Sequence, residues 1–246
     1  MEAVVLAGGL GTRLRERVPD TPKAMAPVAG RPFLAWLLDH LAEAGVRRVI
    51  LSVGYLGEAI RSFFGKRYGT LELAYAIETS PLGTGGGLRN ALRIASPSDE
   101  PIWTLNGDSI VRMDYPGMWS AHRIRAGNSR AVTLAITAAP DASRYGAVEI
   151  REGRIVGFNP AGTEREALIN AGVYLFHRRV LEGWSLPAAF SLEADFLARL
   201  ADRLEIHAFQ TEGWFIDIGV PTDYERAQAE LPAALSRRRP GTGETC

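Results

Sequence analysis

The fold of this chain is decided by Ala3-Val4-Val5-Leu6-Ala7, which runs directly into Gly8-Gly9-Leu10-Gly11-Thr12-Arg13. The apolar run predicts a short buried strand, and the glycines predict a loop that presents backbone N–H groups to phosphates. Pro22-Lys23 follows about ten residues later. Together these features favour a nucleoside triphosphate over a redox cofactor as the ligand of the loop.

Two other glycine loops can be tested against the same residues. A dinucleotide fingerprint G-x-G-x-x-G that begins at Gly9 would need glycine where Leu14 stands. It would also need an acid near the end of the second strand, which reads Ser52-Val53-Gly54. The Walker pattern G-x-x-x-x-G-K-[ST] does not occur in the sequence. The loop therefore belongs to another class of phosphate-binding loop.

The first half of the chain alternates short apolar runs with helical patterns. This alternation predicts an α/β fold with a three-layer, mostly parallel sheet. Ligands of such sheets bind at the carboxyl ends of the strands, where the glycine loop falls. Strands are expected at Glu2–Ala7, Arg48–Val53, Leu71–Ile77 and Ile102–Asn106, and helices at Pro32–Ala44, Gly57–Gly65 and Gly83–Ala95.

The second half is predicted to be rich in strands. Four prolines between Arg15 and Pro32 predict an irregular, functional loop before it, and Gly153 predicts a hairpin turn within it. We expect one domain over residues 1–231, with a nucleotide-binding half to about 110, a substrate half from about 111, and a flexible tail at 232–246. The expected elements are helices at Tyr115–Ala126, Ser191–Leu200 and Thr222–Glu230, and strands at Ala131–Ala138, Gly146–Ile150, Arg154–Phe158, Ile169–Phe176 and Glu205–Gln210.

Bulk composition excludes several classes of protein. The 28 acidic and 28 basic residues of the 246 give a net charge of +0, which offers no electrostatic basis for binding nucleic acid or an anionic membrane. Apolar runs fall short of the roughly 20 residues of a membrane helix. The single cysteine, Cys246, leaves no disulfide framework or cysteine metal site. We expect a cytoplasmic protein, with the oligomeric state, a homo-oligomer included, left open.

Several motifs along the chain carry a family resemblance. The sequence resembles the sugar-1-phosphate nucleotidyltransferases over residues 1 to about 231, and its short length and Ser191-Leu192-Glu193 are most similar to the heptose-1-phosphate guanylyltransferases among them. The resemblance implies a Rossmann-like, glycosyltransferase-A-like fold. The motifs are Leu6 to Leu14, Thr21-Pro22-Lys23, Pro81 to Gly86, Asn106-Gly107-Asp108, Arg144-Tyr145-Gly146, Asn170 to Tyr174, and Phe215 to Gly219.

Four charged residues are the candidates for the chemistry. The resemblance implies that Arg13 stabilises the leaving pyrophosphate and that Lys23 contacts a phosphate near the reacting centre. Asp108 ends a predicted strand, and Asp217 lies in an apolar run where an acid is costly unless it is paired or bound to metal. Two converging carboxylates would hold Mg²⁺ together with phosphate oxygens. The alternatives are a turn or helix-cap aspartate at Asp108 and an ion pair with an arginine at Asp217.

The remaining candidates divide between the two substrates. Glu78 could accept from guanine N1 and N2, or could be a solvated residue at a strand end; the four histidines are assigned to structure or surface. The expected nucleotide-binding residues are Leu6, Gly8, Gly9, Gly11, Thr12, Glu78, Pro81, Gly83 and Thr84, and the resemblance implies that Asn106, Gly107, Tyr145, Gly146, Glu149, Asn170 and Gly172 bind the sugar.

One segment departs from the family pattern. Many relatives carry Glu-Lys just after Gly157-Phe158, and that lysine helps to hold the sugar phosphate, whereas this chain reads Asn159-Pro160-Ala161-Gly162. Either Arg144 or Arg165 replaces the lysine, or Lys23 and the metal suffice, or the grip on the sugar is weaker.

Together with these residues, the resemblance implies transfer of a nucleoside monophosphate from a triphosphate to a sugar 1-phosphate. The resemblance to the guanylyltransferases further implies that the triphosphate is GTP and that the acceptor is a heptose 1-phosphate. Because the attacking phosphate oxygen is already anionic, positioning and charge neutralisation are the main needs. The alternatives are a uridylyl-, thymidylyl- or cytidylyltransferase for another sugar, and a silent sugar-nucleotide sensor that regulates a partner.

Overall fold

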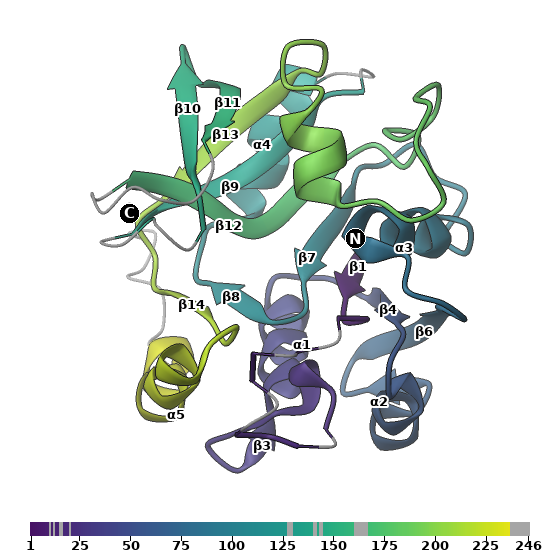
Figure 1. Ribbon diagram of the computed structural model, residues 1–246, viewed down its shortest axis with the longest axis vertical. Coiled ribbons are helices and arrows are strands. Elements are labelled where there is room, and N and C mark those ends of the chain that lie inside the picture. Colours follow the sequence, from purple (N-terminus) through teal and green to yellow (C-terminus); the bar gives the residue numbers. More distant parts are fainter. Residues whose placement is uncertain are drawn as a thin grey trace, which may run out of the picture.

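The computed structural model describes residues 1–9, 11, 13–14, 17–19, 21–126, 130–139, 142, 145–159 and 167–236. Within these residues, ten strands form one mixed sheet. They are β1 (Glu2–Leu6), β4 (Arg48–Val53), β5 (Arg67–Tyr68), β6 (Leu71–Ile77), β7 (Ile102–Asn106), β9 (Val132–Ala139), β10 (Ala147–Arg151), β11 (Arg154–Asn159), β12 (Ala167–Phe176) and β13 (Ile206–Thr211). Their order across the sheet is β10-β11-β13-β9-β12-β7-β1-β4-β6-β5 (Figure 1).

The nucleotide half has the predicted parallel arrangement. Strands β7, β1, β4 and β6 are parallel neighbours, and helices α1 (Phe33–Glu43), α2 (Gly57–Phe64) and α3 (Gly83–Leu92) connect them. Alternate residues of β1 enter two cores: Val5 packs with α1 and α2, and Val4 packs with α3. Because strand residues point alternately to opposite faces, α1 and α2 cover one face and α3 the other. The three-layer prediction is confirmed.

The second half joins the same sheet through β12, which pairs antiparallel with both β7 and β9. Helix α4 (Tyr115–Ala126) has the predicted bounds, whereas the helix expected at Ser191–Leu200 is a π-helix, η2 (Leu192–Ala198). Helix α5 (Pro221–Ser236) continues past Pro232, so residues 232–236 belong to a helix and not to the expected tail. Residues 237–246 lie outside the described part of the chain, in which no helix is long and apolar enough to cross a membrane.

Two tight hairpins show how turn residues set local structure. Glu152 and Gly153 both have positive φ between β10 and β11, which is the geometry of a type I′ turn and confirms the predicted hairpin. The loop expected between Arg15 and Pro32 is more regular than predicted. It contains a 3₁₀ turn, η1 (Lys23–Met25), and a two-strand hairpin of β2 (Pro27–Val28) and β3 (Arg31–Pro32).

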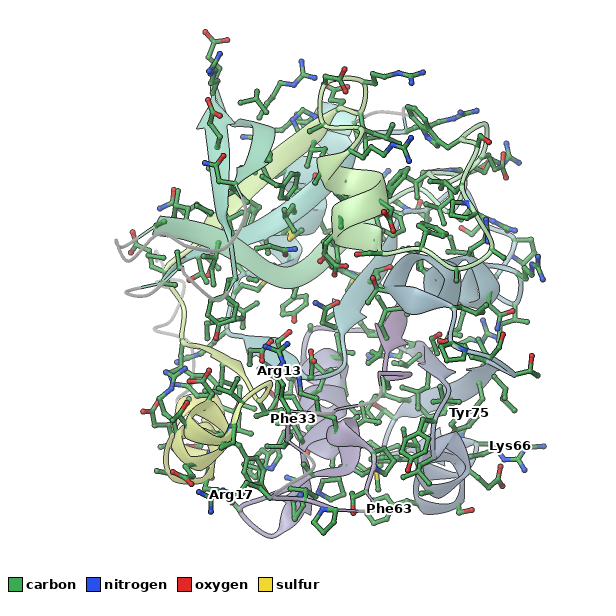
Figure 2. All side chains as sticks on the ribbon, in the orientation of Figure 1. Arg13, Arg17, Phe33, Phe63, Lys66 and Tyr75 are labelled. Atoms are coloured by element: carbon green, nitrogen blue, oxygen red, sulfur yellow. The ribbon has the colours of Figure 1, made fainter. Side chains whose placement is uncertain are left out.

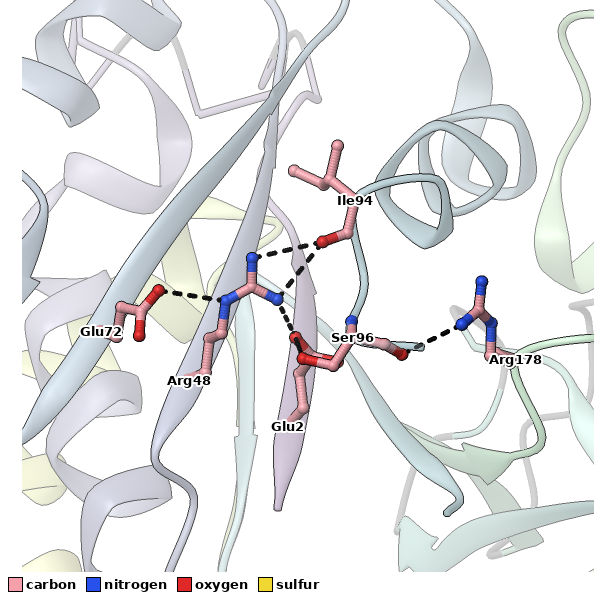
Figure 3. A network of polar contacts seen from close by, with 6 residues as sticks. All are labelled: Glu2, Arg48, Glu72, Ile94, Ser96 and Arg178. Atoms are coloured by element: carbon pink, nitrogen blue, oxygen red, sulfur yellow. Dashed lines mark hydrogen bonds and ion pairs between the residues drawn. The ribbon is translucent and has the colours of Figure 1, made fainter. Parts of the chain in front are cut away.

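The amino ends of the parallel strands are joined by a polar network (Figure 3). Arg48 on β4 contacts Glu2 on β1 and Glu72 on β6, and it donates to the carbonyl of Ile94 after α3. Arg178 donates to the carbonyl of Ser96 in the same region. Glu2 and Glu72 thus balance the charge of Arg48 at the end of the sheet opposite the glycine loop.

Candidate active site

The glycine loop leaves β1 at the carboxyl end of the sheet, as predicted. A Cβ on Gly8 would lie 2.7 Å from Oε1 of Glu78, so a side chain there would displace this carboxylate. Gly11 has a φ of +60°, which glycine adopts without strain. Arg13 is exposed and lies near the middle of the view in Figure 2, while Thr12 falls outside the described residues.

A short antiparallel ribbon brings the two predicted metal-binding aspartates together. It consists of β8 (Ser109–Val111) and β14 (Phe215–Asp217), with Asp217 opposite Ser109. Asp108 immediately precedes β8, and its carbonyl accepts from the N–H of Ile218 at 2.9 Å. The register of this ribbon therefore places Asp108 and Asp217 side by side, although they are 109 positions apart in the sequence and share no local sequence signal.

Lys23 lies between the two carboxylates. Its Nζ is 2.5 Å from Oδ2 of Asp108 and 4.0 Å from Oδ1 of Asp217. The Lys23 side chain is only 14% exposed, against 33% for Asp108 and 23% for Asp217. An ammonium so far withdrawn from water is stabilised by both carboxylates. The structure thus joins three of the four residues that the sequence singled out for chemistry.

Gly219 closes this cluster. Its N–H donates to Oδ1 of Asp217 at 2.5 Å, which holds the carboxylate in one orientation. A Cβ at this position would lie 2.5 Å from that oxygen and 3.2 Å from Nζ of Lys23. The glycine is therefore required by the close approach of backbone and carboxylate.

The donor atoms of this cluster suit a hard divalent cation. Asp108 and Asp217 offer oxygen ligands, the type that Mg²⁺ takes up together with substrate phosphates. No group of three or more His, Cys, Asp or Glu that could hold a metal occurs within the described residues. A cation here would accordingly need phosphate or water oxygens to complete its ligands.

A cavity of about 300 Å³ opens between the glycine loop and the carboxyl ends of β1, β6 and β7. Its volume lies at the lower end of the range for small-molecule sites. Most of the predicted nucleotide-binding residues lie on its wall, together with two of the predicted sugar-binding residues. It is lined by Leu6, Ala7, Gly8, Gly9, Lys23, Ala24, Glu78, Pro81, Gly83, Thr84, Asn106, Gly107 and Asp108.

Glu78 is held firmly in the wall of this cavity. Ser52 Oγ donates to its Oε1 at 3.1 Å, and the N–H of Leu82 donates to its Oε2 at 3.1 Å. Gly8 and Gly87 flank the carboxylate, and a Cβ on either would lie 2.7 Å from Oε1. Glu78 is therefore an oriented, half-buried acceptor and not a solvated residue at a strand end.

The glycines of α3 contact both the cavity and a segment of the second half of the chain. Gly83 lines the cavity, whereas the N–H groups of Gly85 and Gly86 donate to the carbonyl of Phe190. A Cβ on Gly85 would lie 2.1 Å from the Phe190 ring. The glycines thus admit a strap, residues 186–191, which crosses α3 from the second half of the chain.

The predicted sugar-binding residues fall into two groups. Gly172 has a φ of +72° and a Cβ there would meet Nδ2 of Asn106 at 3.0 Å, so β12 approaches the end of β7 closely. Asn170 lies two residues away, and its Oδ1 accepts from the N–H of Gly172 at 2.8 Å. Asn106, Gly107, Asn170 and Gly172 therefore lie close together.

The second group begins beside the first, because Ala147, which follows Gly146, pairs with Ile169, which precedes Asn170. Tyr145 OH donates to Asp223 at 3.2 Å, and Gly146 follows Tyr145 in the same turn. Glu149 is exposed on β10, where it pairs with Arg151. Arg144, Ala161 and Arg165, on which the question of the replaced lysine depends, lie outside the described residues.

Buried side chains support the structural assignment of His122. Burial lowers its pKa to about 4, and its Nδ1 contacts the hydroxyl of Thr133 at 2.8 Å. Sequence reasoning gave no role to Tyr174, and used Glu193 only for the resemblance. The structure links both to the site, because Tyr174 OH bonds to Asn170 and to Glu193.

Comparisons with known proteins agree with this geometry. Residues 2–234 match the family described as Nucleotidyl transferase. The chain is 39% identical over 231 residues to the D-glycero-alpha-D-manno-heptose 1-phosphate guanylyltransferase of Aneurinibacillus thermoaerophilus, covering 94% of this chain and 98% of the relative.

Solved structures give the same result. The crystal structure of HddC from Yersinia pseudotuberculosis is similar with a TM-score of 0.81 at 31% identity, covering 94% of this chain and 99% of that one. The structure of HddC complexed with GMP-PN is similar with a TM-score of 0.80, at the same identity and coverage. With its fold, its glycine loop and its carboxylate–lysine cluster, the chain belongs to the nucleotidyl transferase family.

Proposed function

We propose that this protein transfers GMP from GTP to a heptose 1-phosphate and releases pyrophosphate. The observation that carries the proposal is the Lys23 ammonium between the carboxylates of Asp108 and Asp217, beside a cavity walled by the glycine loop. The names of the similar heptose 1-phosphate guanylyltransferases supply the base and the sugar. We place this reaction in the cytoplasm, where both substrates would be free small molecules.

In the proposed reaction, an oxygen of the sugar phosphate attacks the α-phosphorus of GTP in line. One phosphorus–oxygen bond forms, the bond from the α-phosphorus to the bridging oxygen breaks, and its electron pair leaves with pyrophosphate. The attacking oxygen is anionic at neutral pH, so no general base is needed. The protein contributes by positioning the two phosphates and by neutralising charge.

Lys23 and Arg13 supply the positive charge for this step. The ammonium of Lys23 has three hydrogens, so it can donate to Asp108 and still present N–H groups to a phosphate. Arg13 follows the glycine loop and offers a planar set of donors for the departing pyrophosphate. We assign Lys23 to the phosphates that react and Arg13 to the leaving group.

Asp108 and Asp217 are the proposed ligands of Mg²⁺. Two carboxylates completed by phosphate oxygens is a common arrangement for this ion. When bound, Mg²⁺ would withdraw charge from the phosphate oxygens that it contacts. The hydrogen bond from Gly219 to Asp217 keeps one of these carboxylates oriented before the substrates arrive.

Glu78 is the proposed reader of guanine. Its two oxygens are fixed by Ser52 and Leu82, yet each keeps a further lone pair for a ligand in the cavity. Guanine presents the N1–H and N2–H donors side by side, which matches a fixed carboxylate. Uracil and thymine present a single N–H on the corresponding edge, so they would donate to only one of the two carboxylate oxygens.

The test measures pyrophosphate release with Mg²⁺ for GTP, UTP, CTP, dTTP and ATP, each paired with heptose, mannose and glucose 1-phosphates. We expect GTP with heptose 1-phosphate to have the highest kcat/KM. Higher kcat/KM for another base or sugar would contradict the substrate assignment. If no pair released pyrophosphate, the protein would be a sensor and not an enzyme.

A second measurement tests Glu78 itself. Glu78→Gln replaces one acceptor oxygen by an N–H₂ group, and we expect kcat/KM for GTP to fall at least tenfold. Glu72→Gln is the matched control, because this carboxylate is 62% exposed and lies on β6, the strand that Glu78 directly follows. Equal preference for GTP in wild type and Glu78→Gln would contradict the assignment.

A further inference from the structure

Glu193 joins the two halves of the proposed active site. Its Oε2 accepts from the hydroxyl of Thr84 on α3 at 2.8 Å, and its Oε1 accepts from the hydroxyl of Tyr174 on β12 at 3.0 Å. Ser191 Oγ also donates to Oε2, at 3.2 Å. One carboxylate thus accepts from three hydroxyl groups, two of which come from elements in different halves of the chain, α3 and β12.

The direction of these hydrogen bonds is fixed by backbone and amide N–H groups. The N–H of Leu192 donates to Thr84 Oγ1 at 2.8 Å, so the hydroxyl hydrogen of Thr84 points to Glu193. Nδ2 of Asn170 donates to Tyr174 OH at 2.8 Å, so the hydrogen of Tyr174 also points to Glu193. The site therefore requires a group that accepts on both oxygens, which an ionised carboxylate does and an amide does not.

Each end of this chain of hydrogen bonds reaches a candidate substrate residue. Thr84 lines the cavity beside the proposed nucleotide site. Asn170 is the predicted sugar-binding amide, and its Oδ1 is already held by the N–H of Gly172. The Asn170 amide donates one hydrogen to Tyr174 and accepts from Gly172 with one lone pair of its oxygen. Its second hydrogen and its second lone pair therefore point in fixed directions.

We propose that Glu193 is a positioning residue. It orients the hydroxyl of Thr84 for contact with the nucleotide and, through Tyr174, orients the amide of Asn170 for contact with the sugar. This inference rests on the proposed function, because it takes Thr84 and Asn170 as substrate contacts. It assigns Glu193 no contact with the reacting atoms.

Tyr174 is suited to transmit this orientation. Its side chain is completely buried, and burial, followed by the neighbouring Glu193 carboxylate, raises the pKa of its hydroxyl well above the ordinary value of 10. The hydroxyl therefore stays protonated at any pH at which the protein functions. It remains a donor to Glu193 and an acceptor for Asn170 throughout.

The strap 186–191 has its own attachment to α3, so changes at Glu193 leave it in place. Arg89 donates to the carbonyls of Leu186, Pro187 and Ala188. Phe190 exchanges backbone hydrogen bonds with the start of α3. We therefore expect variants of Glu193 to fold.

The experiment compares Glu193→Ala, Glu193→Gln and Tyr174→Phe by steady-state kinetics. We expect Glu193→Ala to raise KM about tenfold for both GTP and the sugar phosphate. Tyr174→Phe should raise only the KM for the sugar phosphate. Glu193→Gln should raise only one of the two KM values, because its amide nitrogen can face only one hydroxyl.

Two further measurements separate positioning from a structural role. In the double variant Glu193→Ala/Tyr174→Phe, the KM for the sugar phosphate should equal that of Glu193→Ala, because both changes cut the same chain. Thr133→Val is the control, since it removes a buried hydroxyl on β9 that contacts His122 and should lower Tm without changing either KM. Additive effects, or KM values within twofold of wild type in Glu193→Ala, would overturn the proposal.

Failure of the proposed function gives a different result. If another triphosphate and sugar phosphate react best in the wild type, the same variants are compared with that pair, and the expected pattern of KM values is unchanged. If no pair reacts, GTP binding is measured by calorimetry. A Kd for Glu193→Ala within twofold of wild type would then overturn the positioning of Thr84.

Discussion

Asp108→Asn separates the chemistry of the carboxylate cluster from its contribution to stability. The change keeps the shape of the side chain and removes its charge, 2.5 Å from the ammonium of Lys23. Coulomb's law gives about 7 kcal/mol for such a pair at an effective dielectric constant of 20, and about 1.7 kcal/mol in water. Asp108 is 33% exposed and Lys23 keeps Asp217 as a partner, so solvent screening favours a loss of stability of about 1 kcal/mol.

The loss in activity should be much larger. The carboxylate that we assign to cation binding disappears, and the ammonium beside it is no longer held in place. Removing one electrostatic contact to the reacting groups costs about 10²–10³ in kcat in other enzymes, or about 3–4 kcal/mol of activation free energy. We therefore expect Asp108→Asn to lose at least 10²-fold in turnover while its Tm changes by only a few degrees.

The assay is pyrophosphate release at saturating substrates, with urea unfolding of the same preparations. Asp99→Asn is the matched control, because it makes the same chemical change on a side chain that is 92% exposed and pairs with His177 away from the cluster. Activity of Asp108→Asn within threefold of wild type, with the fold intact, would refute the assignment of this carboxylate to the reaction.

Two other predictions follow from named contacts. Gly219→Ala places a Cβ 2.5 Å from Oδ1 of Asp217, so we expect kcat to fall at least tenfold with unchanged circular dichroism; wild-type kcat would show that the orientation of Asp217 does not matter. Burial lowers the pKa of His122 to about 4, against about 6.5 in the unfolded chain, so below pH 6.5 protons bind preferentially to the unfolded state. The free energy of unfolding should fall by about 1–3 kcal/mol between pH 6.5 and 4, and urea titrations of His122→Asn should show a flatter dependence; an identical slope in both proteins would contradict this origin.

Apolar runs with clear borders made most of the fold predictable. The bounds of β4, β6, β7 and α4 agree with the sequence. Each of the three strands is a largely apolar segment, and their ends are marked by polar or turn residues. The short hairpin of β2 and β3 was missed because two-residue strands carry no periodicity. Helix α5 extends beyond the predicted end at Glu230. Pro232 disfavours a continued helix in the sequence, but Leu231 is fully buried and packs in the core, which holds the last turns in place.

In the candidate site, too, residues marked by local sequence could be predicted, and residues joined only by tertiary packing could not. Asn106 and Asp108 could be found because Asn106 ends β7, at the edge of the sheet where the glycine loop lies, and Asp108 follows two residues later. Glu193 could not be assigned a role, because Thr84, its partner, lies 109 residues away and only tertiary packing joins them. The contact between Gly85 and Phe190 could not be predicted either, since the sequence shows that a Cβ is missing and not which atom takes the space.

The contact between those glycines and Phe190 has a consequence for recombining this enzyme with its relatives. Gly85 has room for no side chain atom as long as the ring of Phe190 lies against it, and the two residues come from segments that a simple crossover would take from different parents. A chimera built to change sugar preference must therefore inherit α3 and the strap 186–191 from the same parent. The unit of exchange in this fold is discontinuous in sequence, although it is a single packed surface in space.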